Sequence, residues 1–508
     1  MESSYWADLV AGEIEETGRR PFLSTGISPS GEIHIGNVRE VLTADVVYRV
    51  LGERRDDVTF NYVADDYDPL RRVYDFLDKA TYEPLVGQPL SNIRCPCGEH
   101  DDYAQHFLEP FLAALGRLRV DVQLERASEM YVSGRMTPYV LKALQGRDRI
   151  VEILHQQTGK QFADGWSPFN PICETCGRMA GTELTGFSTS AETIAYRCPC
   201  GSEGERPIAG GGKLTWRVDW PARWAMFGVT VEPFGKDHST RGGSYDTGVQ
   251  IVRDIYGFEP PFPIPYEWIR LKGGGDMSSS KGNVLSVGKI LEVVPPEVLR
   301  YMIVKDRPGR RINFDPGMGI LRWVDEVDDP ETADRDERAL ELSRAAGFEP
   351  VGVPFKHLIV VGQAAGFDVD NAGAILRRTG FADVDNSALA TRLGYAQRWL
   401  DAFGPEEMRF EVQKELPSAV ADLDDDQRRF LGELAVRLTD QLEGDGIHDV
   451  IYEVAGGFEG VKPGRLFQSI YVALLGKARG PRAGWFVSLL GVPFCVDRFR
   501  EASIAPGS

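Results

Sequence analysis

A short apolar run from Phe22 to Thr25 ends at Gly26, and a helical pattern from about Ile35 to Leu51 then leads into a second run, Val58 to Ala64. Strand, glycine turn, helix and strand in this order open a parallel α/β sheet, because parallel neighbours need a long crossover between them. The sequence therefore predicts a parallel-sheet α/β domain near the N-terminal end.

The strand pattern stops and later resumes. Between roughly Gln88 and Gly212 the chain has cysteine pairs and Gly/Pro turns, which indicates an inserted module. Strands are then predicted at Lys213 to Val218, Val229 to Phe234 and Ile264 to Leu271, with a helix at Ser244 to Ile255. Beyond about Pro295, apolar spacings of three and four residues predict helices, among them Val298 to Val304, Gln427 to Leu442 and Leu466 to Leu475.

One segment at the first strand-to-helix turn is suited to binding phosphate. It reads from Gly26 through Ser28 to His34, Gly36 and Asn37. Small residues let a ligand approach the backbone, and a helix N-terminus offers N–H groups and a positive dipole end. His34 and Asn37 can both donate hydrogen bonds to a triphosphate. By itself the motif is weak, because an N-cap and a surface histidine would look the same.

A second segment of the same character follows the last predicted strand, from Gly273 to Asn283. A loop rich in glycine and serine can close over phosphates and offer them hydroxyls, backbone N–H groups and one ammonium. Its candidate phosphate contacts are Met277, Ser278, Ser279, Ser280 and Lys281.

Together the two segments resemble the HIGH and KMSKS signatures of class I aminoacyl-tRNA synthetases, and their wording is similar to the lysyl type common in archaea. The phrase Met277 to Asn283 within the second segment fits that family, as do three further phrases, and the likeness spans most of the chain: Val218 to Trp224, Gly235 to His238 and Ile470 to Pro481. The resemblance implies that His34, Asn37 and Lys281 are catalytic, with MgATP as a substrate.

Two positions depart from the general signatures. Asn37 replaces the last histidine of the first motif but keeps a donor there. Asp276 and Ser279 stand where the second motif has lysines, so that phosphate neutralisation would fall mainly on Lys281.

The resemblance also implies a lysine pocket lined by Gly26, Ser28, Trp220, His238 and Tyr266. Flat aromatic walls suit an aliphatic stem and a cation, and the first two residues bring backbone and hydroxyl groups close to the reacting carboxylate. The acidic partner of the ammonium stays open between Glu40, Asp65, Asp219 and Asp237, each of which could instead cap a helix or pair with arginine.

Six of the seven cysteines form tight pairs, which in an intracellular chain suits metal better than disulfides. The spacing of Cys173, Cys176, Cys198 and Cys200 predicts a structural zinc site, because four thiolates fill a tetrahedral shell. For a second site the resemblance points to Cys95, Glu99, His100 and His106, whereas ligand softness favours Cys97 over Glu99. Cys495 is interpreted as a packed thiol.

Charge and hydropathy bear on partners and compartment. The net charge of −19 opposes a nucleic-acid partner, although high salt would screen the repulsion. No long uncharged apolar run is present and the first residues are acidic, so we expect a soluble cytoplasmic protein that does not enter membranes.

With the resemblance, the chain is expected to be a Rossmann-type catalytic domain, interrupted by a zinc-containing insertion and followed by an all-α C-terminal region. The expected segments are residues 1–87 and 213–293 for the catalytic domain, 88–212 for the insertion, 294–385 for a helical stem-contact region and 386–508 for a helical anticodon-binding domain.

The expected activity is ligation of L-lysine to tRNA(Lys). The alternatives are another class I synthetase, for instance glutamyl, a nucleotidyltransferase of the same superfold, and a non-catalytic zinc-containing RNA-binding paralogue.

Overall fold

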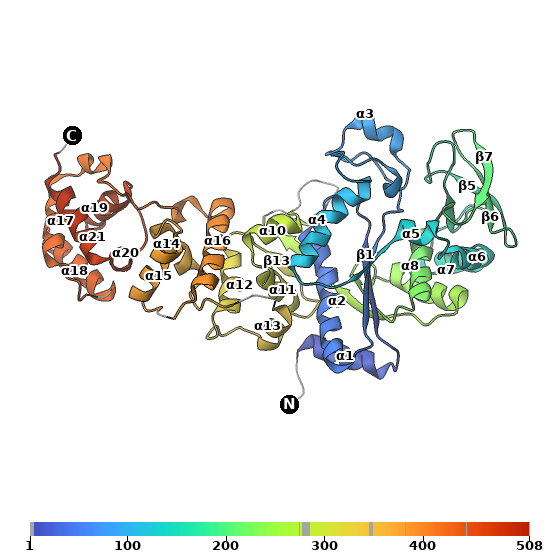
Figure 1. Cartoon of the computed structure of the whole chain (residues 1–508), viewed down its shortest axis with the longest axis horizontal. Helices are drawn as coiled ribbons and strands as arrows, with labels where there is room; N and C mark the ends of the chain where they lie inside the picture. The colour runs from blue at the N-terminus through green and yellow to red at the C-terminus, as the bar shows by residue number, and fades with distance from the viewer. Residues whose placement is uncertain are drawn as a thin grey trace. The chain divides into compact units, whose positions relative to one another are not determined.

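The computed structural model describes residues 5–273, 285–344, 349–381, 383–442 and 444–506, and residues 275 and 276 by their backbone. It divides into two compact units. The first comprises Met1–Leu291, Pro296–Asp315 and Asp336–Ala346, and the second comprises Glu292–Pro295, Pro316–Arg335 and Gly347–Ser508. Figure 1 shows a sheet crossed by helices in the first unit and a succession of helices in the second.

A five-stranded parallel sheet forms the centre of the first unit, in the order β10-β9-β1-β2-β3. Its strands are β1 (Phe22–Ile27), β2 (Thr59–Ala64), β3 (Gln123–Arg126), β9 (Val231–Gly235) and β10 (Phe262–Tyr266). The predicted parallel-sheet α/β core is therefore confirmed. One edge strand, β3, comes from within residues 88–212, so the sheet and the inserted segment share a strand.

The first strand and helix form where the sequence predicts them. Helix α2 (Ile35–Arg54) crosses from β1 to β2, and one of its faces is buried through Ile35, Val38 and Leu42. Gly26 lies opposite Val63 in the β1–β2 register, and a Cβ at this glycine would lie 2.4 Å from the carbonyl oxygen of Val63. A side chain here would push the two strands apart.

Two predicted strands differ from the structure. Of the run Lys213 to Val218, only β8 (Gly212–Leu214) is a strand, paired antiparallel with β4 (Phe169–Pro171), and helix α8 (Trp216–Phe227) begins two residues later. The run Ile264 to Leu271 is broken, because its second half, β11 (Ile269–Leu271), joins a separate sheet with β12 (Gly275–Asp276) and β13 (Ile312–Phe314).

The inserted segment carries a small antiparallel sheet of its own, in the order β5-β6-β7. These strands are β5 (Glu183–Ser188), β6 (Thr193–Arg197) and β7 (Glu203–Pro207). Less exposed and more exposed residues alternate along each of them, and only β6 has fully buried residues, so one face of the sheet is open.

Both units contain further α-helices. Besides α2 and α8, those of the first unit are α1 (Trp6–Glu16), α3 (Lys79–Tyr82), α4 (Tyr103–Arg117), α5 (Ala127–Val132), α6 (Thr137–Gln145), α7 (Arg147–Thr158), α9 (Ser244–Ile251), α11 (Pro296–Val304) and α13 (Glu337–Ser343). Helix α10 (Val287–Val293) begins in the first unit and ends in the second.

The region from residue 294 onward, predicted to be all-α, is mostly helical but contains one short strand, β13, which pairs with β11. The second unit contains helices and no strand among its described residues. They are α12 (Gly319–Asp328), α14 (Phe355–Ala364), α15 (Val369–Arg378), α16 (Asn386–Phe403), α17 (Asp425–Arg437), α18 (Gly444–Gly456), α19 (Pro463–Leu475), α20 (Ala483–Leu490) and α21 (Val492–Ile504). Cys495 is completely buried in the core of this unit, as expected for a packed thiol.

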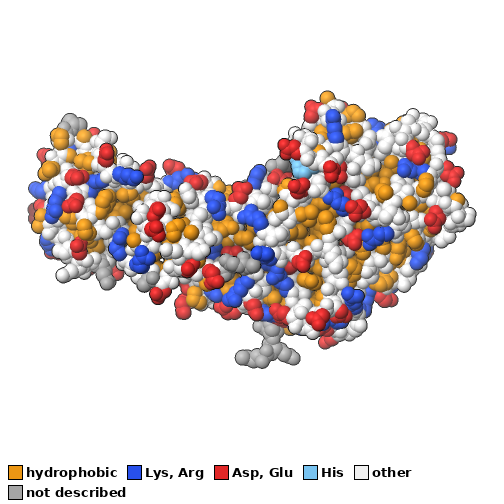
Figure 2. Space-filling view, viewed as in Figure 1, with side chains coloured by type: hydrophobic (Ala, Val, Ile, Leu, Met, Phe, Trp, Pro, Cys, Tyr) orange, Lys and Arg blue, Asp and Glu red, His pale blue; other side chains and the backbone are white. Residues whose placement is uncertain are grey.

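On the face seen in Figure 2, acidic and basic side chains are interspersed. None of the helices that the structure describes is both long and apolar enough to cross a membrane.

Candidate active site

A cavity of about 710 Å³ opens at the carboxyl ends of β1, β2, β9 and β10. This is where ligands bind in open parallel sheets, because the loops after the strands diverge there. All five residues of the expected amino-acid pocket line it: Gly26, Ser28, Trp220, His238 and Tyr266. The cavity thus brings together residues that are separated by as many as 240 positions in the chain.

Glu40 lies on α2 at the wall of this cavity with hydrogen-bond donors but no cation beside it. The Tyr266 hydroxyl donates to its Oε2 (2.7 Å) and the Gly26 N–H donates to its Oε1 (3.2 Å). Burial raises the pKa of Glu40 to about 7, and these two hydrogen bonds oppose the rise. Among the described residues Glu40 forms no ion pair, so a cationic ligand would find this carboxylate uncompensated.

The other acidic candidates already have partners or lie in solvent. Asp65 is paired with Lys213 (2.7 Å) and Arg223 (2.8 Å), and Asp219 is paired with the same two cations. The side chain of Asp237 is 52% exposed and lies 3.6 Å from the His238 ring. Of the four candidates, Glu40 alone is largely shielded from solvent without a countercharge among the described residues.

Aromatic side chains of α8 form one wall of the cavity. Trp220 stacks on Trp216 with ring centroids 5.2 Å apart, and its ring lies 5.4 Å from that of His238. Its indole N–H donates to Glu232 Oε1 on β9 (2.8 Å), which fixes the ring orientation. Burial raises the pKa of Glu232 well above the usual range, and burial likewise lowers the pKa of His238 against the pull of Asp237.

His34 is the N-cap of α2. Its Nδ1 accepts the N–H of Gly36 (3.0 Å), and Asn37 Oδ1 accepts the His34 N–H (3.1 Å), which makes a reciprocal capping box. Burial lowers the pKa of His34 to about 4, so the ring is neutral at pH 7. Because Nδ1 is an acceptor, the proton resides on Nε2, which is left to donate to a ligand. Asn37 also keeps its amide N–H groups for donation and lines the cavity.

The second phosphate-binding segment, Met277 to Lys281 with Ser278, Ser279 and Ser280, lies outside the described residues. The structure does describe the chain on both sides of this segment. On one side β12 pairs with β11, and on the other Ser286 forms an antiparallel bridge with His34. The chain therefore re-emerges from this segment beside the first motif.

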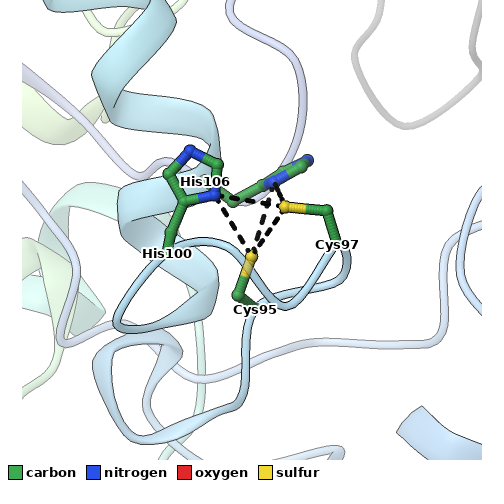
Figure 3. Close-up of side chains that lie close together, drawn as sticks. All are labelled: Cys95, Cys97, His100 and His106. Atoms are coloured by element: carbon green, nitrogen blue, oxygen red, sulfur yellow. Dashed lines mark hydrogen bonds between the residues drawn. The ribbon is translucent and has the colours of Figure 1, made fainter.

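Four donor atoms converge near the start of α4, from Cys95, Cys97, His100 and His106 (Figure 3). Cys97 Sγ lies 3.2 Å from the Nδ1 atoms of both histidines, and Cys95 Sγ lies 3.3 Å from Nδ1 of His100. Tetrahedral zinc with bonds of about 2.0–2.3 Å needs donors roughly 3.3–3.8 Å apart, and the donor pairs here, at 3.2–3.6 Å, lie within that range or just short of it. Glu99 is exposed and lies outside the cluster. The fourth donor of the cluster is Cys97, and not Glu99 as the resemblance implies.

The second cluster has the predicted members, Cys173, Cys176, Cys198 and Cys200, with all donor atoms within 4.8 Å of one another. Two sulfur pairs are 3.7 and 3.5 Å apart. Four thiolates at these distances match a closed, structural zinc site.

Two acidic residues that line the cavity, Asp68 and Glu232, were not expected from the sequence, and neither was Lys213, which lies behind Asp68. Asp68 accepts the Ser28 hydroxyl and pairs with Lys213. A lysine inside the run Gly-Gly-Gly-Lys-Leu gave one weak signal, since lysine is scarce in this chain and uncommon in buried strands.

A parallel sheet with a histidine-capped helix after its first strand, and a polar cavity at the carboxyl ends of its strands, defines a nucleotide-binding α/β protein. The chain belongs to the class I tRNA synthetases: residues 4–346 match the family described as tRNA synthetases class I (K), and residues 403–503 match an anticodon binding domain.

Similar curated proteins extend over the whole chain. A lysine–tRNA ligase from Methanosarcina barkeri is 45% identical, covering 99% of this chain and 98% of its own. One from Archaeoglobus fulgidus is 44% identical, covering 98% and 100%, and one from Thermoplasma acidophilum is 39% identical, covering 99% of each.

Proposed function

We propose that the chain is a lysine–tRNA ligase, which activates L-lysine with MgATP and transfers it to the 3′ end of tRNA(Lys) in the cytoplasm. The observation that carries the proposal is the partly buried, uncompensated carboxylate of Glu40 in a cavity with an aromatic wall. An ε-ammonium supplies the missing charge, and its methylene stem lies against Trp220. The lysine–tRNA ligases that resemble this chain over its full length support the same substrate.

The first step is attack by a lysine carboxylate oxygen on the α-phosphorus of ATP, which forms lysyl-adenylate and releases pyrophosphate. The 2′-hydroxyl of the terminal adenosine then attacks the acyl carbon, and AMP leaves. No protein nucleophile is required. We assign phosphate binding to His34, Gly36 and Asn37, together with the Met277–Lys281 segment, whose ammonium would neutralise the departing charge.

We propose that zinc is structural at both clusters. Cys95, Cys97, His100 and His106 would hold one ion, and the four cysteines from Cys173 to Cys200 would hold the other. Bound there, zinc supplies cross-links between loops and no step of the reaction. The helical region from residue 386 onward, which includes the matched anticodon binding domain, would bind the anticodon by stacking and hydrogen bonding on splayed bases.

ATP–pyrophosphate exchange with each standard amino acid, with and without tRNA and at low and high salt, tests the substrate. We expect exchange that depends on lysine. Exchange with glutamate in place of lysine would point to the glutamyl alternative, and no exchange under any condition would point to a non-catalytic RNA-binding protein.

Replacing His34 by alanine should lower adenylate formation at least about tenfold, since it removes a donor aimed at charge that develops in the transition state. Binding of tRNA, measured by filter retention, should change little. Because the pKa of His34 is about 4, the wild-type contribution should be constant from pH 6 to 8. His155, an exposed histidine on α7, gives the matched control H155A. An equal loss of tRNA binding in H34A would contradict the assigned role.

A further inference from the structure

Lys213 is a lysine buried almost completely in the first unit, with only 2% of its surface exposed. It lies on β8, where the chain returns from the inserted segment to the helix that carries Trp220. An ammonium group cannot be buried without anions, and three carboxylates surround this one. They belong to Asp65 (2.7 Å), Asp68 and Asp219 (3.7 Å).

Asp68 connects this ammonium to the cavity. One of its carboxylate oxygens, Oδ1, pairs with Lys213, and the other, Oδ2, accepts the hydroxyl of Ser28 (2.5 Å). Because the Ser28 hydroxyl donates its hydrogen to Asp68, the lone pairs of Ser28 Oγ are available to a ligand in the cavity. Ser28 is therefore set to accept a hydrogen bond from a ligand N–H group.

The other two carboxylates around Lys213, those of Asp65 and Asp219, have further buried partners. Arg223 on α8 pairs with both Asp65 and Asp219. The Tyr131 hydroxyl donates to Asp219 Oδ1 (2.5 Å) and accepts the N–H of Leu214, next to Lys213 (3.1 Å). Lys213 thus joins an anchored group of buried charges to one partly exposed carboxylate, Asp68, at the cavity wall.

We propose that Lys213 is a positioning residue for the amino-acid substrate: it holds Asp68, and through it the Ser28 hydroxyl, so that Ser28 accepts a hydrogen bond from the substrate's α-ammonium. Lys213 itself lies behind Asp68 and touches no substrate. The proposal rests on the amino-acid activation proposed above. It adds Lys213, which does not line the cavity, to the residues on which amino-acid binding depends.

A charge-matched variant separates positioning from stability. Lys213→Met alone leaves three carboxylates facing one guanidinium, and it is expected to unfold at a lower temperature than the wild type. The pair Lys213→Met with Asp219→Asn removes one charge of each sign, and the amide oxygen introduced by the second substitution can still accept the Tyr131 hydroxyl. Asp219→Asn alone is the control, because Lys213, Asp68 and Ser28 stay in contact.

In pyrophosphate exchange, K213M/D219N should raise KM for lysine at least about tenfold, the scale of one lost hydrogen bond to a charged group. KM for ATP and the melting temperature should stay close to those of D219N. A purely structural lysine would give the opposite pattern: KM for lysine would follow the melting temperature, and both would recover in the double variant. That result would overturn the proposal.

A double-mutant cycle with Ser28→Ala tests whether Lys213 acts on the substrate through Ser28. If Lys213 acts through Ser28, adding S28A to K213M/D219N raises KM for lysine by less than about twofold, whereas S28A in the wild type raises it several-fold. Independent, multiplying effects would overturn the proposal. Should the wild type respond to another amino acid, the substrate assignment fails, but the same variants are then scored on KM for that amino acid, since every amino acid carries the α-ammonium.

Discussion

Glu40→Gln is expected to raise KM for lysine by about a hundredfold while leaving KM for ATP within about threefold. Removing one partner of a buried, hydrogen-bonded charge pair costs about 2–5 kcal/mol, and a factor of a hundred corresponds to about 2.7 kcal/mol. Glutamine keeps the shape of the side chain and an oxygen to accept the Tyr266 hydroxyl or the Gly26 N–H. The loss therefore reports charge rather than packing.

Asp237→Asn is the matched control, because it removes one carboxylate charge from the same cavity at a half-exposed position. Its KM for lysine should change by less than about threefold, the scale of a solvent-screened pair. A large effect of D237N with a small effect of E40Q would assign the ammonium subsite to Asp237 in place of Glu40.

The same carboxylate gives the free enzyme a pH dependence. The pKa of Glu40 is raised to about 7 by burial, and the ionised form is the one that binds a cation. Below pH 7 the side chain takes up a proton, so KM for lysine should rise as pH falls from 7.5 to 5.5, approaching tenfold per unit at the low end. E40Q should be flat over this range in pyrophosphate exchange.

Local patterns predicted much of the sheet because its strands are short apolar runs bounded by turns. β1, β2 and β9 and helix α2 fall within a few residues of their expected positions. β3 was missed because Gln123–Arg126 is a polar edge strand, whose place depends on pairing with β2. Edge strands expose one side, so their composition carries little of the period-two signal.

The error at Lys213 to Val218 has a different cause. The alternation of polar and apolar residues there suits a strand, but Trp216, Trp220 and Trp224 recur every fourth residue, which is the period of a helix face. In the structure these rings contact one another along α8: Trp216 and Trp220 stack with centroids 5.2 Å apart, and Trp224 is tilted against Trp220 with centroids 4.8 Å apart. The longer pattern determines the structure because burying the indoles of Trp220 and Trp224 outweighs the local strand preference of six residues.

The five residues of the expected amino-acid pocket could be predicted from the resemblance, but the division of roles among the acidic residues could not. Glu40, Asp65 and Asp219 look alike in sequence, and only the placement of Lys213 and Arg223 shows that two of the three carboxylates are already neutralised. Likewise, Cys97 and Glu99 are two residues apart, and the turn at Gly98, with φ of 79°, directs one into the cluster and leaves the other exposed.

Replacing Cys173 by serine should have the largest structural effect. The sheet β5-β6-β7 is open on one face and buries few large side chains, among them Ile194 and Tyr196, so it cannot be stable on its own core. Structural zinc contributes about 10–16 kcal/mol of apparent binding free energy to such modules. Losing one thiolate should therefore release the ion and unfold the segment from Cys173 to Pro207.

Zinc content by mass spectrometry and limited proteolysis measure this directly. C173S should lose one equivalent of zinc and be cut rapidly within residues 173–207, whereas C495S, at a buried cysteine outside both clusters, should keep all its zinc. C97S should lose the other equivalent and E99Q should lose none. Full zinc content with an unchanged melting curve in C173S would contradict a structural ion there, and zinc loss in E99Q would return Glu99 to the first site.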